Sequence, residues 1–236
     1  MRSIAGLWVS ALLLIPACRH QPATAIPPER SVAPGINAEY LKPDLDVDQW
    51  VERFEKEGRE IYDQRDRIVD ATGVKPGLVV ADIGAGSGLF TLEFAGRVGT
   101  RGTVYAVDVV KDFLTRIAVR AEAAGWRNVR TILASERSVE LPPNSIDLAF
   151  ICDTYHHFEY PAGTMASLHR ALRRGGEVVV IDFRRIPGQS SDWILGHVRA
   201  GQETFEAEIV AAGFEKIEEQ AFLRDNYFLR FRKVAR

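Results

Sequence analysis

The sequence predicts an α/β fold with a mainly parallel sheet, and three observations support this prediction. Apolar runs of strand length alternate with stretches of helical periodicity through most of the chain. The runs 146–151 and 178–181 are almost continuously apolar, which is typical of strands that helices cover on both faces. Two strand-like runs, 215–223 and 226–233, follow each other so closely that they must be antiparallel. We therefore expect a seven-stranded, mostly parallel sheet with an antiparallel last strand.

The other elements can be placed in order along the chain. Between 47 and 71, apolar residues recur at helical spacing, which predicts an amphipathic helix broken near Gly58. Gly175 and Gly176 are expected to end a later helix and to allow a sharp return into the next strand. The remaining strands are expected over 79–83, 103–108, 128–134 and 176–183, and the remaining helices over 89–98, 111–124, 162–174 and 203–212.

The most informative motif joins the first of these strands to its helix. The strand contains Asp82, and glycines follow at positions 84, 86 and 88, where the absence of a Cβ lets the backbone approach a ligand. The spacing is D-x-G-x-G-x-G. A dinucleotide fingerprint, G-x-G-x-x-G, would place a glycine at 89, where the chain has Leu89. The motif predicts a nucleotide-type cofactor site, although such a run can also be merely a tight turn. The residues predicted to bind the cofactor here are Asp82, Gly84, Gly86 and Gly88.

A second acidic residue supports this interpretation. Asp108 ends the second strand, 20 residues after Gly88. In a βαβ unit an acid at this position can bind the ribose hydroxyls of a nucleotide. The alternative is a solvated acid that happens to end a strand.

The motif resembles motif I of the class I S-adenosylmethionine (SAM) dependent methyltransferases, and the resemblance covers roughly residues 75–183. It implies a Rossmann-like three-layer sandwich, SAM as the cofactor, and methyl transfer to an acceptor that we expect to be a small molecule. It also implies that Asp82 sets the glycine loop and the methionine end of SAM, and that Asp108 holds the ribose. In many members an N-terminal helix caps the cofactor pocket, so Tyr62 or Arg65 could face the ligand; simple packing against the sheet is the alternative.

Two further segments follow from the resemblance. The family places a polar residue after the third strand to bind adenine, and that position falls on Ser135 and Glu136, where Asp or Asn is more usual. Glu136 could accept a hydrogen bond from the adenine amine, or it could begin a short helix. The fourth strand ends in the sequence CDTYHHF, where polar residues mark the binding edge of an open α/β sheet. Asp153 in this segment is predicted to bind the cofactor.

The histidine pair in this segment is the candidate for acid-base chemistry. The similar segment of the ubiquinone-biosynthesis-like methyltransferases also carries a His pair, which borders cofactor and substrate. His156 or His157 could therefore act as a general base, or could simply bond to backbone at a helix start. No metal site is expected, because no recognisable ligand spacing joins this pair to the other histidines, among them His169 and His197.

Composition and the N-terminal end limit the number of domains, the partners and the location that we expect for this protein. The 236 residues, 46% of them hydrophobic, suffice for one catalytic domain, and a net charge of −2 with interspersed signs gives no electrostatic argument for nucleic acid. Residues 1–25 resemble an export signal, which could be a cleaved signal peptide, a lipoprotein signal cleaved before Cys18, or an uncleaved anchor. Residues 26–46 are expected to form a linker, and 47–236 the methyltransferase domain. This places the protein in the cell envelope or periplasm, with a membrane tether through the N-terminus if Cys18 is lipidated. A mis-assigned start would leave it in the cytoplasm.

Two other functions stay open on the sequence alone. The first is a catalytically silent SAM- or nucleotide-binding module tethered at the envelope, suggested by the export signal and by the atypical Ser135 and Arg174. The second is a nicotinamide oxidoreductase, which Leu89 and the terminal hairpin disfavour.

Overall fold

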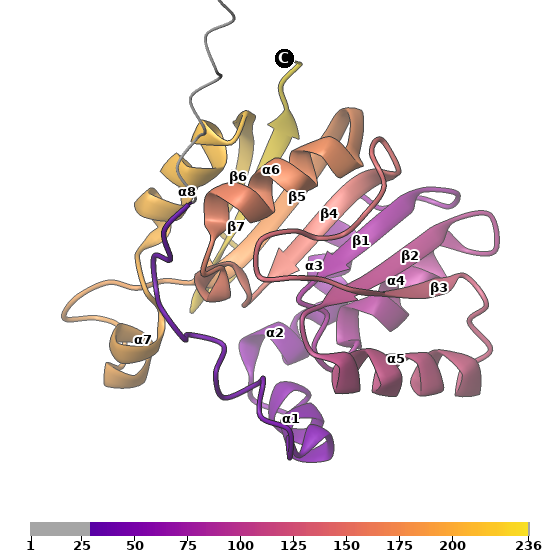
Figure 1. Ribbon diagram of the computed structural model, residues 1–236, viewed down its shortest axis with the longest axis horizontal. Coiled ribbons are helices and arrows are strands. Elements are labelled where there is room, and N and C mark those ends of the chain that lie inside the picture. Colours follow the sequence, from indigo (N-terminus) through magenta and orange to yellow (C-terminus); the bar gives the residue numbers. More distant parts are fainter. Residues whose placement is uncertain (1–28, 236) are drawn as a thin grey trace, which may run out of the picture.

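A computed structural model describes residues 29–235 (Figure 1). The predicted leader over 1–25, with Cys18, lies outside the described residues. One seven-stranded sheet runs through the molecule in the order β3-β2-β1-β4-β5-β7-β6. The strands β3, β2, β1, β4 and β5 are parallel to one another, whereas β7 is antiparallel to both β5 and β6. The predicted fold class, with its antiparallel last strand, is therefore confirmed.

The bounds of the elements agree closely with the sequence pattern. The strands are β1 Val79–Ile83, β2 Thr103–Asp108, β3 Val129–Leu133, β4 Ile146–Cys152, β5 Leu172–Phe183, β6 Phe214–Gln220 and β7 Asn226–Lys233. The helices are α1 Val47–Phe54, α2 Glu60–Asp63, α3 Arg65–Ala71, α4 Leu89–Val98, α5 Lys111–Ala123, the 3-10 helix η1 Tyr155–His157, α6 Pro161–Ala171, α7 Asp192–His197 and α8 Gln202–Ala211.

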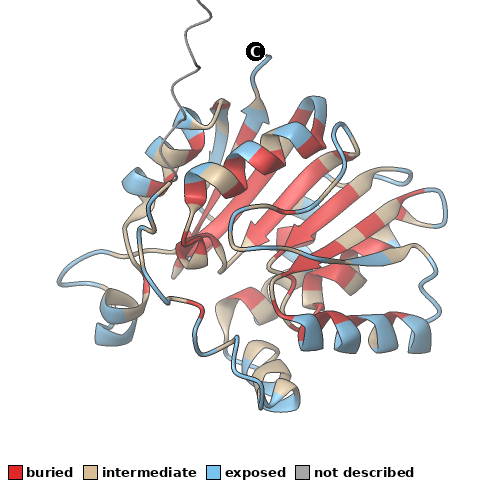
Figure 2. Ribbon diagram, in the orientation of Figure 1, coloured by how far each residue is buried: buried red, intermediate tan, exposed pale blue. Residues whose placement is uncertain are grey.

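The sheet is the middle of three layers, and its strands form the buried centre of the molecule (Figure 2). Alternate residues of a strand face opposite layers, so Ala149 and Phe150 of β4 belong to different apolar clusters. One cluster packs the sheet against α6 and α8, through residues such as Met165 and Phe205. The other packs it against α3 and α4, through residues such as Ile68 and Phe94. This double cover explains why the strands read as nearly continuous apolar runs.

Two local predictions need correction. Helix α6 ends at Ala171, three residues earlier than expected, and β5 begins at Leu172 instead of residue 176. Gly175, with φ +74°, therefore lies inside the strand and does not end the helix. The register with β4 shifts here: Ile146 pairs with Leu172, and Leu148 pairs with Glu177. The extra residues form an irregularity of the kind that glycine permits in a strand.

The expected break in the first helix occurs where Gly58 separates α1 from α2. A short helix, α7, lies in the stretch 184–201, for which no element was predicted. Its N-cap residue, Ser191, accepts a hydrogen bond from the backbone N–H of Ile194. Within residues 29–235, no helix combines the length and apolar character that a membrane crossing needs.

Candidate functional site

The glycine loop between β1 and α4 is built from backbone conformations that favour glycine. Gly84, Gly86 and Gly88 all have positive φ, at +69°, +51° and +83°. The N–H groups of Gly84 and Ala85 both donate to the carbonyl of Val107, which ties the loop to the end of β2. A Cβ on Gly84 would lie 2.2 Å from Thr154 Cγ2, so the close approach of β1 to β4 leaves no room for a side chain there. The loop is a tight cradle at the carboxyl edge of the sheet.

Asp108 closes the other side of this cradle. Its Oδ2 accepts the N–H of Gly86 at 2.9 Å, and its Oδ1 accepts the N–H of Val110 at 2.8 Å. The side chain is buried, and burial raises the pKa of the carboxyl to about 6 against the lowering effect of the backbone hydrogen bonds from Gly86 and Val110. The predicted ribose ligand therefore also holds the glycine loop in place.

Asp82 lies beneath the loop and is almost completely buried. Its Oδ2 accepts the hydroxyl of Thr91 on α4 at 2.6 Å, in the α3/α4 layer. Burial raises the pKa of this carboxyl to about 7, and the nearby Asp108 charge adds to the effect, while the Thr91 hydrogen bonds lower it. Two buried carboxyl groups so close to one ligand pocket are well placed to meet cationic or hydroxyl-bearing groups of a ligand.

These residues line one cavity, which encloses about 830 Å³ of non-atom space including its open mouth. A volume of this order suits a nucleotide-sized ligand. Of the predicted site residues, Asp82, Gly84, Gly86, Asp108, Asp153 and His157 line it. Gly88 does not; it is the N-cap of α4, where a Cβ would lie 2.7 Å from Ile117 Cγ1. His156 does not line the cavity either.

A smaller cavity adjoins the first, and the two share Asp108 and His157 on their walls. Ser135 and Glu136 line this smaller cavity. They lie in a turn closed by the bridge between Ser135 and Ser138, so the alternative that Glu136 begins a helix is wrong. The position after β3 thus lies beside the cofactor cradle, and the adenine contact stays a prediction.

The N-terminal segment 29–46 forms part of the pocket wall, which differs from the expected linker. Glu29 accepts the N–H groups of Ala162 and Gly163 at the start of α6, both at 2.8 Å. Further along, the amide of Asn37 donates to Glu136 Oε1 and to the carbonyl of His157, each at 3.2 Å. Helix-terminal N–H groups and buried polar atoms hold this Pro- and Gly-containing segment against the domain.

The sequence did not indicate the cavity-lining residues of this region. Asn37 and Tyr40 line the larger cavity, and Tyr40 packs against Trp50 and, edge-on, against His157. Burial raises the pKa of the Tyr40 hydroxyl. Tyr40, Trp50 and Phe54 could have indicated this wall. Three aromatic side chains close together in a polar N-terminal stretch are expected to pack against the surface of the domain.

The suggestion that Tyr62 or Arg65 could face the ligand is not supported, because α2 and α3 place neither side chain at the cavity. Neither Tyr62 nor Arg65 lines the cavity; the Arg65 side chain donates to the carbonyl of Tyr62 and stacks on its ring. Arg59 faces the cavity instead and forms an ion pair with Asp153. The amide of Asn226 donates to the second oxygen of Asp153 at 2.6 Å. Asp153 has a φ of +46°, so the segment after β4 carries backbone strain at the pocket wall.

The two histidines of η1 differ in environment. His156 is buried, with its Nδ1 2.8 Å from Asp182 Oδ1, whereas His157 borders both cavities. The pKa of His157 is lowered to about 2, chiefly by burial and to a smaller extent by the neighbouring His156 and His197. His157 is thus neutral and a weak base, so general-base catalysis stays a prediction that its environment does not favour. The fold also brings His197 beside the pair, which its sequence spacing did not indicate.

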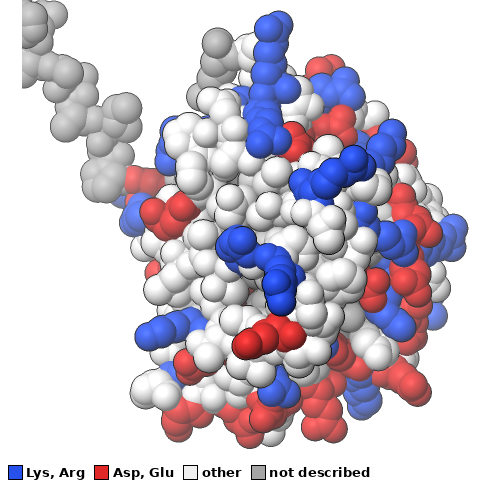
Figure 3. All heavy atoms as spheres, turned by 90° about the vertical axis from the view of Figure 1, so that its right-hand side faces the viewer, with Lys and Arg blue, Asp and Glu red and all other residues white. Residues whose placement is uncertain are grey.

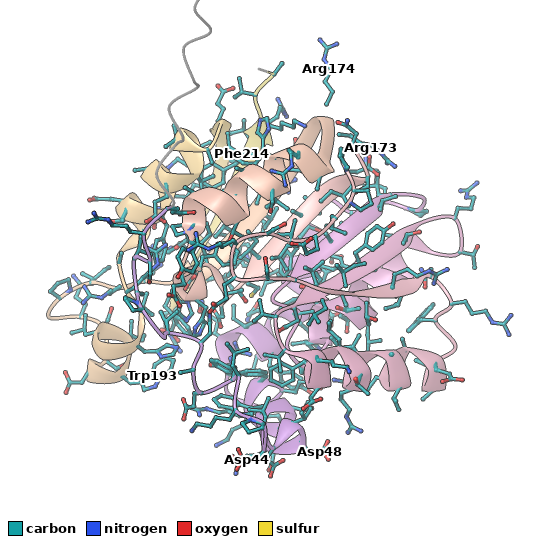
Figure 4. All side chains as sticks on the ribbon, viewed as in Figure 1. Asp44, Asp48, Arg173, Arg174, Trp193 and Phe214 are labelled. Atoms are coloured by element: carbon teal, nitrogen blue, oxygen red, sulfur yellow. The ribbon has the colours of Figure 1, made fainter. Side chains whose placement is uncertain are left out.

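The carboxyl edge of the sheet lies at one end of the molecule. In Figure 4, Asp44, Asp48 and Trp193 lie toward this end, whereas Arg173, Arg174 and Phe214 lie at the opposite end. On the face drawn in Figure 3, cationic and anionic side chains both surround a mainly uncharged area, so neither sign dominates that face.

Comparison with known proteins agrees with this geometry. Residues 81–180 match the methyltransferase domain family. Two relatives are ubiquinone/menaquinone biosynthesis C-methyltransferases UbiE: that of Hydrogenovibrio crunogenus is 27% identical over 119 residues, and that of Shewanella oneidensis 26% over 118. Each alignment covers 50% of this chain and 47% of the relative, so the match spans about half the length of these relatives.

Solved structures share the fold at lower identity. A SAM dependent methyltransferase from Aquifex aeolicus superposes with a TM-score of 0.72 and 21% identity, covering 80% of this chain and all of that one. The [4+2]-cyclase SpnF gives a TM-score of 0.64 at 18% identity, covering 77% and 86%. The matched family, the order of the strands in the sheet and the glycine loop agree with one another. Together they imply that the cofactor is SAM. Residues 81–180 thus match a methyltransferase domain, and the chain has the class I SAM-dependent methyltransferase fold.

Proposed function

We propose that this protein transfers a methyl group from SAM to a small-molecule acceptor. The observation that carries the proposal is the meeting of the glycine loop, Asp82 and Asp108 in one cavity at the carboxyl edge of the sheet. A loop with glycine at positions 84 and 86 and two buried carboxyl groups fit a ligand that has ribose hydroxyls and positive charges. The family match and the two C-methyltransferase relatives support the same activity.

The residues of the chain then have distinct tasks. Asp108 would bind the ribose hydroxyls, Asp82 would stabilise the methionine end, and Ser135 or Glu136 would meet the adenine. When bound, SAM supplies a methyl group that its sulfonium has already activated. The protein's contribution is to align the acceptor and exclude water, and positioning of this kind can lower a barrier by about 7–11 kcal/mol.

The acceptor would enter from a neighbouring cavity that shares Arg59 and Asp153 with the cofactor cavity. Phe183 and Trp193 line it together with Asn226. Such a mixed aromatic and polar lining suits a small acceptor better than a polymer.

A SAM-binding module without turnover is the alternative function, and it stays a prediction. The fold by itself does not decide, because SpnF, a protein named as a cyclase, shares it. A screen of purified protein for S-adenosylhomocysteine release with small phenols, quinols, amines and thiols distinguishes the two: release with any acceptor excludes the silent module.

Export through residues 1–25 is also a proposal. Its test is cell fractionation of the full chain and of a Cys18→Ser variant. A lipoprotein requires that the wild type be in the membrane fraction and that the variant leave it.

Replacing Asp108 with alanine tests the cofactor site. Loss of buried hydrogen bonds to the ligand and to Gly86 is expected to weaken SAM binding by about 1–3 kcal/mol, or roughly 5- to 150-fold. Calorimetric titration with SAM measures this, and NADH serves as the competing ligand. Asp112→Ala, an exposed acid in the first turn of α5, is the control and should bind as the wild type does. Unchanged affinity in Asp108→Ala would remove Asp108 from the site.

Replacing Tyr40 with alanine tests the N-terminal wall. Tyr40 lines the cavity and packs on Trp50 and His157, and one aromatic pair contributes about 0.5–1.5 kcal/mol. We expect SAM affinity to fall by roughly 2- to 12-fold. Tyr62→Ala is the matched control, since Tyr62 does not line the cavity. Equal losses in both variants would contradict a specific role for Tyr40.

A further inference from the structure

Three histidines from separate parts of the chain converge beside the cofactor cavity. His156 and His157 lie in η1, and His197 is the last residue of α7. One ring nitrogen of each lies within 4.8 Å of the other two. The Nε2 atoms of His156 and His197 are 3.2 Å apart. Three imidazoles in one place form a donor set that suits a transition metal.

A buried carboxylate fixes the first of these rings. Asp182 on β5 is fully buried, and its Oδ2 accepts the backbone N–H of His156 at 3.1 Å. Its Oδ1 lies 2.8 Å from Nδ1 of the same ring. Because a carboxylate can only accept, Nδ1 carries the proton and Nε2 presents a lone pair toward His197. A carboxylate that holds the far nitrogen of a histidine is the arrangement that orients metal-binding imidazoles.

A second observation points independently to a ligand. Nδ1 of His157 is buried and has no hydrogen-bond partner within the part of the chain that the structure describes. A buried polar atom without a partner is costly and calls for an explanation. The facing Nε2 atoms of His156 and His197 can share at most one proton, and Asp182 already holds His156 in the acceptor form. A cation among the rings would bind the Nδ1 lone pair of His157 that the protein leaves unused, and it would replace the hydrogen bond between His156 and His197.

The spacing of His156 and His197 also suits a metal ion. Zinc binds imidazole nitrogens at about 2.0–2.1 Å in tetrahedral geometry, which places two such ligands about 3.3 Å apart. The observed distance between the Nε2 atoms of His156 and His197 is 3.2 Å. Trp193, labelled on α7 in Figure 4, stacks on His197 with ring centroids 4.6 Å apart and restrains that ring.

We propose that His156, His157 and His197 bind one divalent transition-metal ion, for which Zn²⁺ is the best match. Three protein ligands leave a fourth position open, which is the arrangement of catalytic rather than structural zinc. His157 forms part of the cofactor-cavity wall, so the ion would lie at the reacting end of the site. The proposal goes beyond methyl transfer, because metal binding requires neither SAM nor an acceptor.

The test is metal titration of the tag-free full chain after treatment with a chelator. Zn²⁺ binding is followed by calorimetry, and Co²⁺ binding by the visible absorption of tetrahedral cobalt. We expect one ion per chain. His197→Ala should weaken binding by more than about 100-fold and remove the cobalt bands, and Asp182→Asn should weaken it by about 10- to 100-fold. His169→Ala, a histidine outside the cluster, should bind as the wild type does.

Thermal unfolding of each metal-free variant shows whether it folds, and His197→Gln serves if the alanine variant does not. A wild type that binds neither ion at one per chain would overturn the proposal. So would a folded His197 variant that binds as tightly as the wild type. SAM titration of the same metal-free protein separates this result from the proposed function, since SAM binding without metal binding refutes only the metal site.

Discussion

Gly84→Ala is expected to abolish measurable SAM binding and to destabilise the protein. The new Cβ would lie 2.2 Å from Cγ2 and 2.9 Å from Cβ of Thr154, so no rotamer of Thr154 relieves the contact. The segment after β4 would have to move away from β1, and both line the cofactor cavity. A non-glycine residue in left-handed backbone costs about 1–2 kcal/mol, and overpacking adds about 1–3 kcal/mol. SAM affinity should fall by more than about 100-fold, which corresponds to roughly 2.7 kcal/mol or more.

A matched control exists for this substitution. Gly99 has a similar φ of +63°, but a Cβ there meets nothing within 4 Å. Gly99→Ala should therefore cost only the backbone strain and leave SAM affinity unchanged. Urea unfolding and calorimetric titration of both variants measure the two effects. If Gly84→Ala binds SAM like Gly99→Ala, the close approach of the two strands does not shape the cofactor site.

The second large effect concerns pH and Asp82. The pKa of Asp82 in the folded chain is about 7, above the ordinary value of 3.8. Between these two pH values, the folded chain keeps a proton on Asp82 that the unfolded chain releases. Because the folded state binds more protons, the free energy of unfolding falls as pH rises from about 4 to about 7. The full loss from this one group is about 4 kcal/mol. Asp82→Asn, which keeps an acceptor for Thr91, should lose this part of the pH dependence.

Urea unfolding without SAM between pH 4.5 and 8 measures the effect. Asp108, whose pKa is raised to about 6, acts in the same direction, so the wild type should have the steeper decline and Asp82→Asn a shallower one. Asp112→Asn, an exposed acid, should follow the wild type. Parallel curves for the wild type and Asp82→Asn would mean that Asp82 is not held in its neutral form.

Local patterns predicted the sheet, and they nominated the glycine loop and Asp108, which the structure brings together. The spacing between Gly88 and Asp108 is set by one βαβ unit, and the structure joins Asp108 to the glycine loop through Gly86. The chain length of a single crossover fixes such a contact, so the sequence reveals it. The start of β5 was not predicted, because the irregularity near Gly175 produces no hydrophobic periodicity in the sequence.

The contacts at the site that the sequence did not predict join segments that are far apart in the chain. Asn37 meets Glu136 across 99 positions, and His197 meets His156 across 41. The path of residues 184–191 decides where α7 carries His197, and no hydrophobic periodicity encodes that path. Tertiary packing of loops determines these contacts, so single-residue patterns could nominate His156 and His157 but could not find their third partner.

The packing of residues 29–46 has a kinetic consequence. This segment is held at Glu29, at Glu159 through Val32 and Gly35, and at Asn37, while its tyrosine lines the cavity. We expect local opening of these anchors to widen the mouth of the cavity and to speed exchange of the cofactor for its spent form, at a cost below that of global unfolding. Turnover could be limited by release through this opening and not by the transfer step itself.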